Sequence, residues 1–342
     1  MNCGLEGMKI LYFVHTYGEK NGIASHLANV IGSLPHGFEA QVIAGSGRGL
    51  PLFSSLRIPT VEILQAMHAD FDVMHIHGYG NFYSFFGALV AALRGKPLVW
   101  TIHGYPRIHG ARKALYYAYR YLMAPFIFWK ADAIISVSSD ILPILQKETG
   151  KKITVMPNGI DLELFKPKGG YRKAECLCFV GRLDPDKGAE RLLECSTLPL
   201  LFIGPDEDGT RGRINAEAEK LGRKAMFAEV NYPQMPEQYE RCRYVALPSK
   251  YEGFPLTLLE AAAMERPFIS TDVGEVKAAL SKLFSKPEKY LLSGNLQEKV
   301  DELEKQDLSR ELEAARKNCE EYSWKKIAEK LCAIYKGLAA SS

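Results

Sequence analysis

Short runs of β-branched and aromatic residues recur along the whole sequence, and each is followed by a longer stretch with helical character. This alternation is the β-α-β rhythm of a parallel sheet. The runs are continuously apolar, which predicts strands that are covered on both faces. In chain order the expected strands are 9–15, 41–44, 73–77, 98–102, 133–137, 154–156, 177–180, 200–203, 244–247 and 268–270.

A turn-rich passage at residues 157–170 interrupts this rhythm, and a chain of 342 residues exceeds what one hydrophobic core usually organises. We therefore expect an N-terminal domain over residues 1–165 and a C-terminal domain over 166–322. An amphipathic helix at 323–340 would pack back on the first domain. Both domains would be α/β, doubly wound and Rossmann-like, with the carboxyl ends of their strands on either side of a ligand-binding cleft.

Composition narrows the class of protein. The chain is 47% hydrophobic and 24% charged, which is typical of a globular protein, and no run approaches the roughly 20 apolar residues of a membrane span. Its seven cysteines show neither metal-ligand spacing nor a disulfide framework. Cys178, in the apolar strand pattern at 177–180, is expected to be core packing. With no cleaved signal apparent, we expect a cytoplasmic protein.

A first charged cluster follows the expected strand at 177–180. Gly181 would let the backbone turn at the strand end, and Arg182 and Lys187 would then emerge at the cleft with a helix N-terminus behind them. A guanidinium and an ammonium together suit a diphosphate. The alternative is that both are solvated surface charges; their position at the carboxyl end of a strand favours the diphosphate.

A second cluster follows the strand at 244–247. Pro255 fits the first position of a helix that continues through residues 256–264, and the free amides of its first turn would face the same cleft. Glu252 precedes this helix and Glu260 lies on its second turn, so each could accept hydroxyl hydrogen bonds from a sugar or a ribose. Taken singly, Glu260 is more readily explained as an ordinary helix-surface acid and Glu252 as a negative residue favoured near a helix N-terminus. Beside the basic pair, the two glutamates favour polyol recognition.

These residues resemble the retaining GT-B glycosyltransferases called group 1, or family 4. The specific part is Glu252-x7-Glu260 within the pattern Pro-Ser-x-x-Glu-Gly-Phe-Pro-x-x-x-x-Glu-Ala. The likeness covers nearly the whole chain. Its supporting parts are Gly181-Arg182-Leu183 followed by Lys187-Gly188, the linker Met156-Pro157-Asn158-Gly159-Ile160-Asp161-x-x-x-Phe165-x-Pro167, and Ser323-Trp324.

The resemblance implies where a donor would bind. Arg182 and Lys187 would hold its diphosphate, Glu260 its ribose, and Glu252 the hydroxyls of the transferred sugar. His103, at a strand end, matches the family's active-site histidine. The expected catalytic residues are His103, Arg182, Lys187 and Glu252. The expected donor-binding residues are Gly22, Gly181, Arg182, Lys187, Glu252, Gly253, Phe254, Pro255, Leu256 and Glu260.

Some positions depart from the family pattern. The usual glycine pair of the N-terminal loop is Asn21-Gly22 here, and residues 274–276 lack the customary Gly-Gly and Pro. His103 also has rivals as the active-site histidine, and a structural role for it competes with a catalytic one. The rivals are His15, His75, His77 and His109.

The implied reaction is the transfer of a hexosyl group, with retention, from a UDP-, GDP- or ADP-linked sugar to a glycan or lipid-linked acceptor. We expect no metal and no cofactor, because two fixed cations serve the diphosphate and residues 184–186 read as a turn. The rival hypotheses are a GT-B sugar-nucleotide epimerase and a non-catalytic nucleotide-sugar-binding protein. A dinucleotide dehydrogenase is disfavoured because the glycine fingerprint is missing.

Residues 105–130 mix arginine and lysine with many aromatic residues in the expected acceptor domain. Such a segment could rest on an anionic membrane surface, which would place the protein at the inner face of the membrane. Equally, its aromatic residues could be core and its cations solvated. Nucleic acid is a distant third partner for such a patch.

Overall fold

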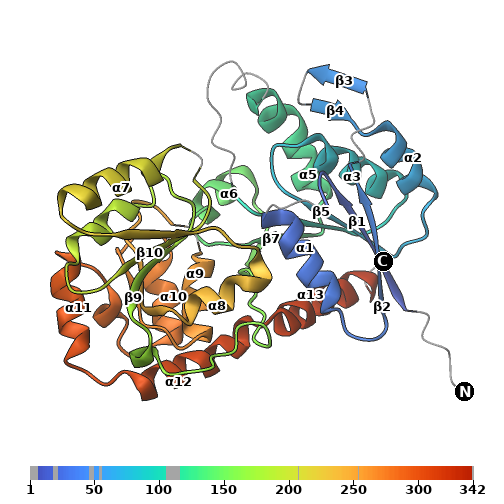
Figure 1. The fold of residues 1–342 in the computed structure, drawn as a ribbon. Helices are drawn as coiled ribbons and strands as arrows, with labels where there is room; N and C mark the ends of the chain where they lie inside the picture. Colours follow the sequence, from blue (N-terminus) through green and yellow to red (C-terminus); the bar gives the residue numbers. More distant parts are fainter. Residues whose placement is uncertain are drawn as a thin grey trace, which may run out of the picture. The chain divides into compact units, whose positions relative to one another are not determined.

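The computed structural model describes residues 7–17, 22–45, 50–53, 56–104, 116–206, 208–252 and 254–340. The chain forms two compact units: unit 1 comprises Met1–Gly159 and Trp324–Ser342, and unit 2 comprises Ile160–Ser323 (Figure 1). Each unit has its own parallel sheet with helices packed against it. The predicted fold class, two Rossmann-like α/β domains, is confirmed.

The sheet of unit 1 has six parallel strands in the order β2-β1-β5-β6-β7-β8. The strands correspond closely to the predicted ones. A short antiparallel pair, β3 (Leu50–Phe53) and β4 (Leu56–Ile58), was not predicted. The bounds of the sheet strands are β1 (Met8–Val14), β2 (Phe38–Ala44), β5 (Val73–His77), β6 (Leu98–Ile102), β7 (Ala133–Ser136) and β8 (Ile153–Val155).

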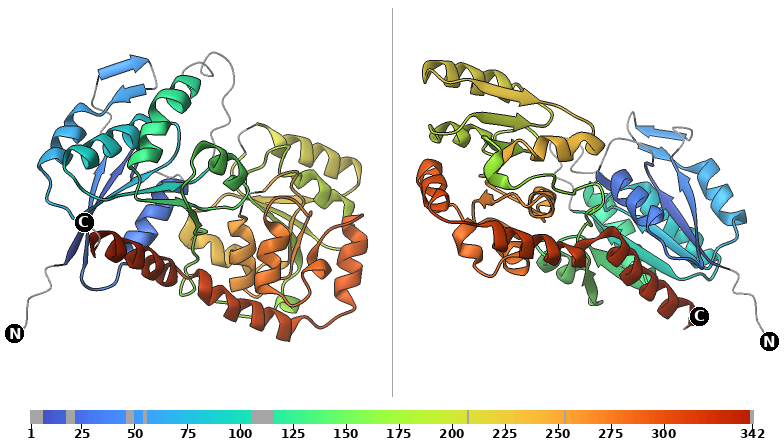
Figure 2. Two further views of the ribbon diagram at one scale, coloured as in Figure 1. Left: turned by 180° about the vertical axis from the view of Figure 1, so that it is seen from behind. Right: turned by 60° about the horizontal axis from the view of Figure 1, so that its bottom comes forward.

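Both faces of this sheet are buried, as its apolar runs predict. On β1, Tyr12 packs into one hydrophobic cluster and Phe13 into another, because successive side chains of a strand point to opposite faces. Helices α1 (Gly22–Gly32) and α13 (Trp324–Ala340) contribute to the cluster that holds Tyr12 (Figure 2). The cluster that holds Phe13 contains α2 (Thr60–His68), α3 (Phe82–Leu93), α5 (Ala124–Lys130) and α6 (Leu142–Glu148).

The C-terminal helix α13 belongs to unit 1 although unit 2 precedes it in the sequence. Its apolar stripe, which includes Leu331 and Tyr335, lies in the unit 1 core. Gly159 lies directly under the ring of Trp324, where an added Cβ would be 2.6 Å from a ring carbon, so only glycine fits there. Next to it, the amide of Ile160 donates to the carbonyl of Tyr322 at 2.8 Å. The two points where the chain passes between units are therefore neighbours.

Unit 2 contains a five-stranded parallel sheet in the order β11-β10-β9-β12-β13. Its strands are β9 (Cys176–Val180), β10 (Leu200–Ile203), β11 (Ala225–Ala228), β12 (Cys242–Leu247) and β13 (Phe268–Ser270). The edge strand β11 was not predicted because it contains no β-branched residue. The α-helices of the unit are α7 (Thr210–Lys220), α8 (Met235–Tyr239), α9 (Leu256–Ala263), α10 (Val276–Leu283), α11 (Leu296–Glu304) and α12 (Ser309–Asn318).

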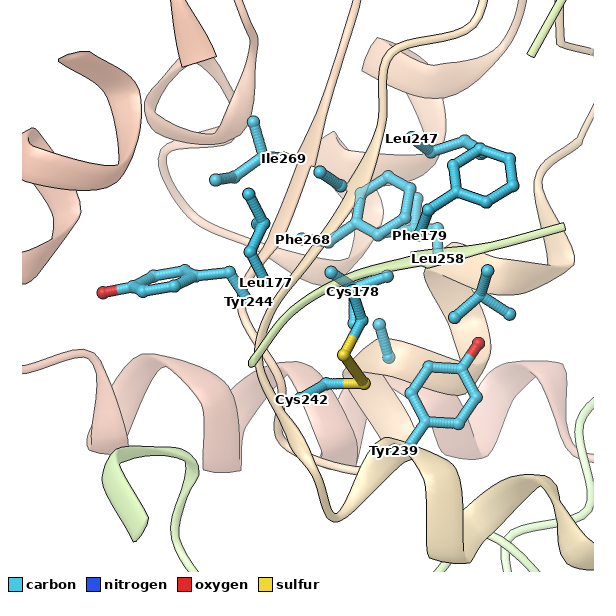
Figure 3. Close-up of a cluster of buried hydrophobic side chains, with 14 of the residues drawn as sticks. Leu177, Cys178, Phe179, Tyr239, Cys242, Tyr244, Leu247, Leu258, Phe268 and Ile269 are labelled. Atoms are coloured by element: carbon cyan, nitrogen blue, oxygen red, sulfur yellow. A yellow bond between two sulfur atoms is a disulfide. The ribbon is translucent and has the colours of Figure 1, made fainter. Parts of the chain in front are cut away.

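Cys178 lies in the core of unit 2, as predicted, but the expectation that the cysteines form no disulfide is wrong. Cys178 on β9 and Cys242 on β12 form a disulfide, with a Cα–Cα distance of 5.5 Å (Figure 3). The two residues lie on neighbouring strands, and a sequence separation of 64 residues does not reveal that adjacency. A disulfide also weakens the cysteine argument for a reducing compartment.

Across the described ranges, no helix is both long enough and apolar enough to cross a lipid bilayer.

Candidate functional site

The candidate site of unit 2 lies where β9 and β12, neighbours in the sheet, both end. The loop after β9 begins at Gly181, whose φ of +152° suits glycine. Two hydrogen bonds join this strand end and its loop to the segment that follows β12. The amide of Lys250 donates to the carbonyl of Asp186 at 2.8 Å, and Thr257 Oγ1 donates to the carbonyl of Val180 at 3.3 Å.

Asp184 shapes the loop after β9. Its Oδ1 accepts hydrogen bonds from the amides of Asp186 at 3.0 Å and Lys187 at 3.1 Å. This is the turn chemistry expected of an aspartate in that position. The turn directs Lys187 toward the segment after β12. At Gly188, with a φ of +63°, an added Cβ would lie 2.4 Å from the carbonyl oxygen of Pro248, so the two loops are in close backbone contact.

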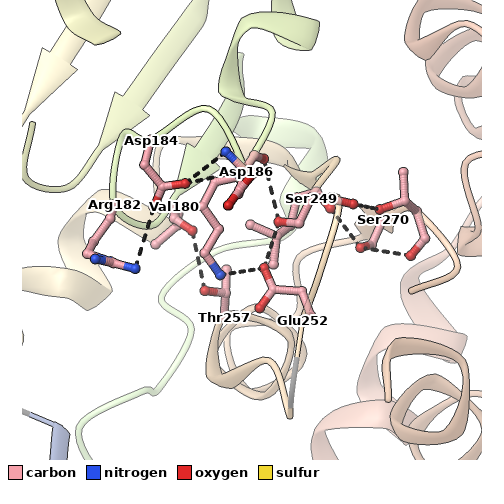
Figure 4. A network of polar contacts seen from close by, with 11 residues as sticks. Val180, Arg182, Asp184, Asp186, Ser249, Glu252, Thr257 and Ser270 are labelled. Atoms are coloured by element: carbon pink, nitrogen blue, oxygen red, sulfur yellow. Dashed lines mark hydrogen bonds and ion pairs between the residues drawn. The ribbon is translucent and has the colours of Figure 1, made fainter. Parts of the chain in front are cut away.

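Lys187 and Glu252 form the centre of the site. Lys187 Nζ lies 2.7 Å from Glu252 Oε1, and Ser249 Oγ donates to the same oxygen at 2.6 Å (Figure 4). The side chains of Lys187 and Glu252 are 24% and 8% exposed, so the ion pair is partly shielded from solvent.

Arg182 lies at the edge of the same network. Its side chain is 58% exposed, and Nη2 is 3.5 Å from Asp184 Oδ2, too far for a strong hydrogen bond. A planar guanidinium that is more than half exposed at the end of β9 is accessible to a phosphate, to which it can make two parallel hydrogen bonds.

The role of Gly274 behind Glu252 was not predicted from the sequence. Gly274 has a φ of +54°, and a Cβ there would lie 1.6 Å from the carbonyl oxygen of Glu252. Any other residue would displace the backbone that carries the carboxylate. The departure from the family pattern at 274–276 therefore keeps the one residue that this contact requires.

Helix α9 begins one residue later than predicted. Pro255 is its N-cap with extended backbone, and Leu256 is the first helical residue. The amides of Leu256 and Thr257 have no intrahelical acceptors, as at every helix start. Phe254 packs its ring 5.6 Å from that of Tyr322, while Gly253 lies outside the described residues. The helix expected behind Lys187 is only a short 3₁₀ segment, residues 189–194, rather than an α-helix.

Glu260 is buried on α9 and does not share the contacts of Lys187 and Glu252. Tyr239 Oη donates to Glu260 Oε2 at 2.7 Å. Burial raises the pKa of the Glu260 carboxyl to about 7, and the Tyr239 hydrogen bond partly opposes that rise. Tyr239 fixes one oxygen, which leaves Oε1 as the acceptor that a hydroxyl could use. The sequence analysis did not identify Tyr239.

In unit 1, His103 follows β6 and belongs to a cluster with His77, at the end of β5, and His26, on α1. His77 Nδ1 lies 3.0 Å from His103 Nε2, and the His26 and His103 ring centroids are 4.8 Å apart. Burial is the main cause that lowers the pKa of all three imidazoles, to about 4 for His26, so the rings are neutral. Gly22 is the first residue of α1, and residues 18–21 before it lie outside the described residues.

The rival histidines have different surroundings. His75 Nε2 is 2.8 Å from Thr101 Oγ1, and its Nδ1 is 2.6 Å from the Tyr335 hydroxyl. That hydroxyl in turn lies 3.0 Å from the Tyr12 hydroxyl, so His75 belongs to a buried polar chain that ties α13 to the sheet. His15 packs edge-on against Tyr83, and His109 lies outside the described residues.

Two family models match the chain. The glycosyltransferase family 4 model covers residues 35–164, and the glycosyl transferases group 1 model covers residues 162–326. Among solved structures, HepE of Anabaena in complex with UDP and glucose is similar, with a TM-score of 0.71 and 17% identity over 97% of this chain and 100% of that one. Sucrose-phosphate synthase of Thermosynechococcus elongatus gives a TM-score of 0.70 and 19% identity over 98% and 100%.

The matches to curated relatives cover a smaller part of each chain than the matches to solved structures do. A UDP-Gal:α-D-GlcNAc-diphosphoundecaprenol α-1,3-galactosyltransferase of Escherichia coli is 26% identical over 59% of this chain and 58% of its own length. D-inositol 3-phosphate glycosyltransferase 1 of Catenulispora acidiphila is 25% identical over 62% and 58%. The chain thus spans less than two thirds of the length of these two relatives. The two matched models and the GT-B fold of the structural neighbours show that the chain belongs to the group 1 glycosyltransferase family.

Proposed function

We propose that this protein transfers a hexosyl group from a nucleotide-diphosphate sugar to an acceptor hydroxyl with retention of anomeric configuration. The observation that carries the proposal is the Lys187–Glu252 pair, 2.7 Å apart at the ends of β9 and β12 and beside the start of α9. It combines a cation for the leaving diphosphate with a carboxylate for the hydroxyls of the sugar. Membership of the glycosyltransferase family supports the same reading.

Cleavage of the anomeric carbon–phosphate bond leaves negative charge on the nucleotide diphosphate. Lys187, Arg182 and the first amides of α9 would stabilise that charge as it develops, which is preorganised electrostatic catalysis. In this proposal the transfer step needs no metal ion and no cofactor. Glu252 accepts hydroxyl hydrogen bonds of the sugar while it still orients Lys187.

The proton of the acceptor hydroxyl needs a destination in a retaining reaction. We propose that a departing phosphate oxygen takes it on the face where the new bond forms. His103, with a neutral ring, would hydrogen-bond the donor sugar or stabilise the cation that develops on it. Glu260 would accept the ribose hydroxyls through Oε1.

The relatives suggest which substrates to try first. UDP-galactose is the donor named for the Escherichia coli relative, and UDP is the nucleotide in the HepE structure. UDP sugars should therefore be tested before GDP and ADP sugars. The same relative acts on a diphosphoundecaprenol-linked sugar. A lipid-linked or glycan acceptor is therefore our proposal here too, with the reaction at the inner face of the membrane.

An exposed aromatic surface in unit 1 supports an acceptor in a membrane. Tyr121, Leu122 and Trp129 are 67%, 75% and 69% exposed, on or beside the segment that ends in Lys130. Exposed tyrosine, leucine and tryptophan side chains favour the lipid–water interface. Sedimentation with anionic vesicles at low salt, weakened by added salt, is expected. Equal sedimentation with and without vesicles would contradict the proposed binding to a membrane surface.

A donor screen tests the central proposal. Thermal shifts with UDP, GDP, ADP and their sugars should identify one nucleotide, because a ligand that binds the native state raises its stability. With that donor, slow sugar release or transfer should be measurable and should be lost in Lys187→Ala. Binding without any turnover would instead identify a nucleotide-sugar-binding protein, and conversion of the donor to its epimer without transfer would identify an epimerase.

A further inference from the structure

The histidine cluster of unit 1 consists of His26, His77 and His103, from α1, β5 and the segment after β6. Each ring offers one nitrogen, and these three nitrogens lie within 4.8 Å of one another. The ring centroids form a nearly regular triangle, with separations of 4.8, 5.3 and 5.7 Å. Three imidazoles from separate elements are thus gathered around one point.

This spacing is close to that of a metal site. In a tetrahedral site with Zn–N distances of about 2.0–2.1 Å, two ligand nitrogens lie about 3.3 Å apart. His77 Nδ1 and His103 Nε2 are 3.0 Å apart, so two of the three ligands need almost no movement. The third ligand nitrogen, on His26, lies within 4.8 Å of the other two and must move closer to complete the set.

The supporting contacts orient two of the rings as ligands. His26 Nδ1 is 2.8 Å from Asn158 Oδ1, which holds the proton on Nδ1 and leaves the Nε2 lone pair available. A polar partner on the second ring nitrogen is typical of metal-bound histidines. His77 Nε2 is buried and has no partner within the part of the chain that the structure describes, so Nε2 can carry the ring proton while Nδ1 binds an ion.

The neighbouring histidine is excluded as a ligand. His75 packs 4.3 Å from His77 between ring centroids, but both of its nitrogens are already occupied by Thr101 and Tyr335. The described group contains no carboxylate. Neutral nitrogen ligands favour zinc-type ions over magnesium or calcium, which prefer oxygen.

We propose that His26, His77 and His103 bind one divalent transition-metal ion of the zinc type, with the fourth position left to water or an exogenous ligand. These histidines belong to unit 1, whereas Lys187 and Arg182 belong to unit 2, and no metal is proposed for the diphosphate chemistry of Lys187 and Arg182. It goes beyond the proposed function, and because it uses His103, a bound ion would withdraw that ring from the sugar.

Cobalt titration of the chelator-treated, untagged protein tests the proposal. One Co²⁺ per chain should bind saturably, with visible absorption bands of a four- or five-coordinate site and without thiolate-to-cobalt charge transfer from cysteine. Zn²⁺ should displace it. His77→Gln should abolish these bands, and Asn158→Ala should weaken Co²⁺ binding about 10-fold, as expected for a residue that orients a ligand.

The matched control is His36→Gln, an exposed histidine in the same unit, which should leave Co²⁺ binding unchanged. Far-UV circular dichroism and thermal unfolding identify any variant that fails to fold, and His26→Asn is a second ligand variant. The proposal is overturned by absence of saturable binding, by binding that survives in folded His77→Gln and His26→Asn, or by equal loss in His36→Gln.

Discussion

The ends of the parallel strands carry opposite chemistry in the two units. In unit 2, charged groups meet where β9 and β12 end, and Lys187 lies 2.7 Å from Glu252. In unit 1, neutral imidazoles meet where β5 and β6 end, with His77 and His103 3.0 Å apart. The same sheet architecture therefore positions a fixed charge in one unit and uncharged, proton-poor rings in the other. The fold alone does not decide what its strand ends bind.

The largest effect is expected from removal of the Lys187 charge. Lys187→Ala should lower turnover of the nucleotide sugar about 10²–10³-fold, because it removes a fixed donor to the leaving diphosphate. Steady-state kinetics with the donor from the thermal-shift screen would measure this. Lys250→Ala, an exposed lysine of the neighbouring loop, is the control and should stay near wild type. Similar losses in both variants would mean that Lys187 acts only through general charge.

The second prediction concerns how unit 2 is held together. The disulfide closes a loop of about 64 residues between β9 and β12, and such links typically stabilise a domain by about 2–4 kcal/mol. Cys242→Ala should therefore lower the free energy of unfolding of unit 2 by about that amount without reductant. Reductant should destabilise the wild type but not this variant. Cys195→Ala, which removes a free thiol, should keep the wild-type response to reductant. If reductant leaves the free energy of unfolding of the wild type unchanged, the disulfide does not form in solution.

Glu260 should make the free energy of unfolding of unit 2 depend on pH. Burial raises the pKa of its carboxyl to about 7, so between its ordinary value near 4.5 and about 7 the native state keeps a proton that the unfolded state has lost. The free energy of unfolding should fall as pH rises through that window, by about 2 kcal/mol between pH 5 and pH 7, and then level off. Denaturant titrations of Glu260→Gln should lack this slope. An equal slope in wild type and variant would assign it to other groups.

The smallest effect tests the uncharged network of unit 1. Tyr335→Phe removes the hydroxyl that contacts both His75 and Tyr12 and should lower the free energy of unfolding by about 1–1.5 kcal/mol. Tyr12→Phe loses only one of these contacts and should cost less. Denaturant unfolding of both variants measures the difference. If Tyr12→Phe proved the more damaging, the chain through His75 would not be what holds α13.

The fold was predictable because apolar runs and turn residues are local signals. Strands such as β5 and β6 have the predicted bounds, and the GT-B assignment followed from motifs in the sequence. Strand β11 was not predicted because its sequence lacks β-branched residues. The Cys178–Cys242 disulfide was not predicted because only the strand order makes the two residues neighbours. The spacing of residues in the sequence does not indicate which strands are neighbours in a sheet.

The candidate site shows the same limit. The motifs identified Lys187 and Glu252, and the structure brings these two into contact. The supporting residues Ser249, Gly274 and Tyr239 act through contacts with residues distant in the sequence or through backbone conformation. The roles assigned to His103, Arg182 and Glu260 stay predictions until the variants are measured.

The placement of α13 has a consequence for biosynthesis. Unit 2 is one continuous stretch of chain, whereas unit 1 needs α13, which follows unit 2 in the sequence. During synthesis the face of the unit 1 sheet around Tyr12 lacks the cover of Leu331 and Tyr335 until α13 has left the ribosome. The later part of the polypeptide can thus mature before the earlier part is finished, and nascent chains cut short before residue 324 would expose an apolar sheet face prone to aggregation.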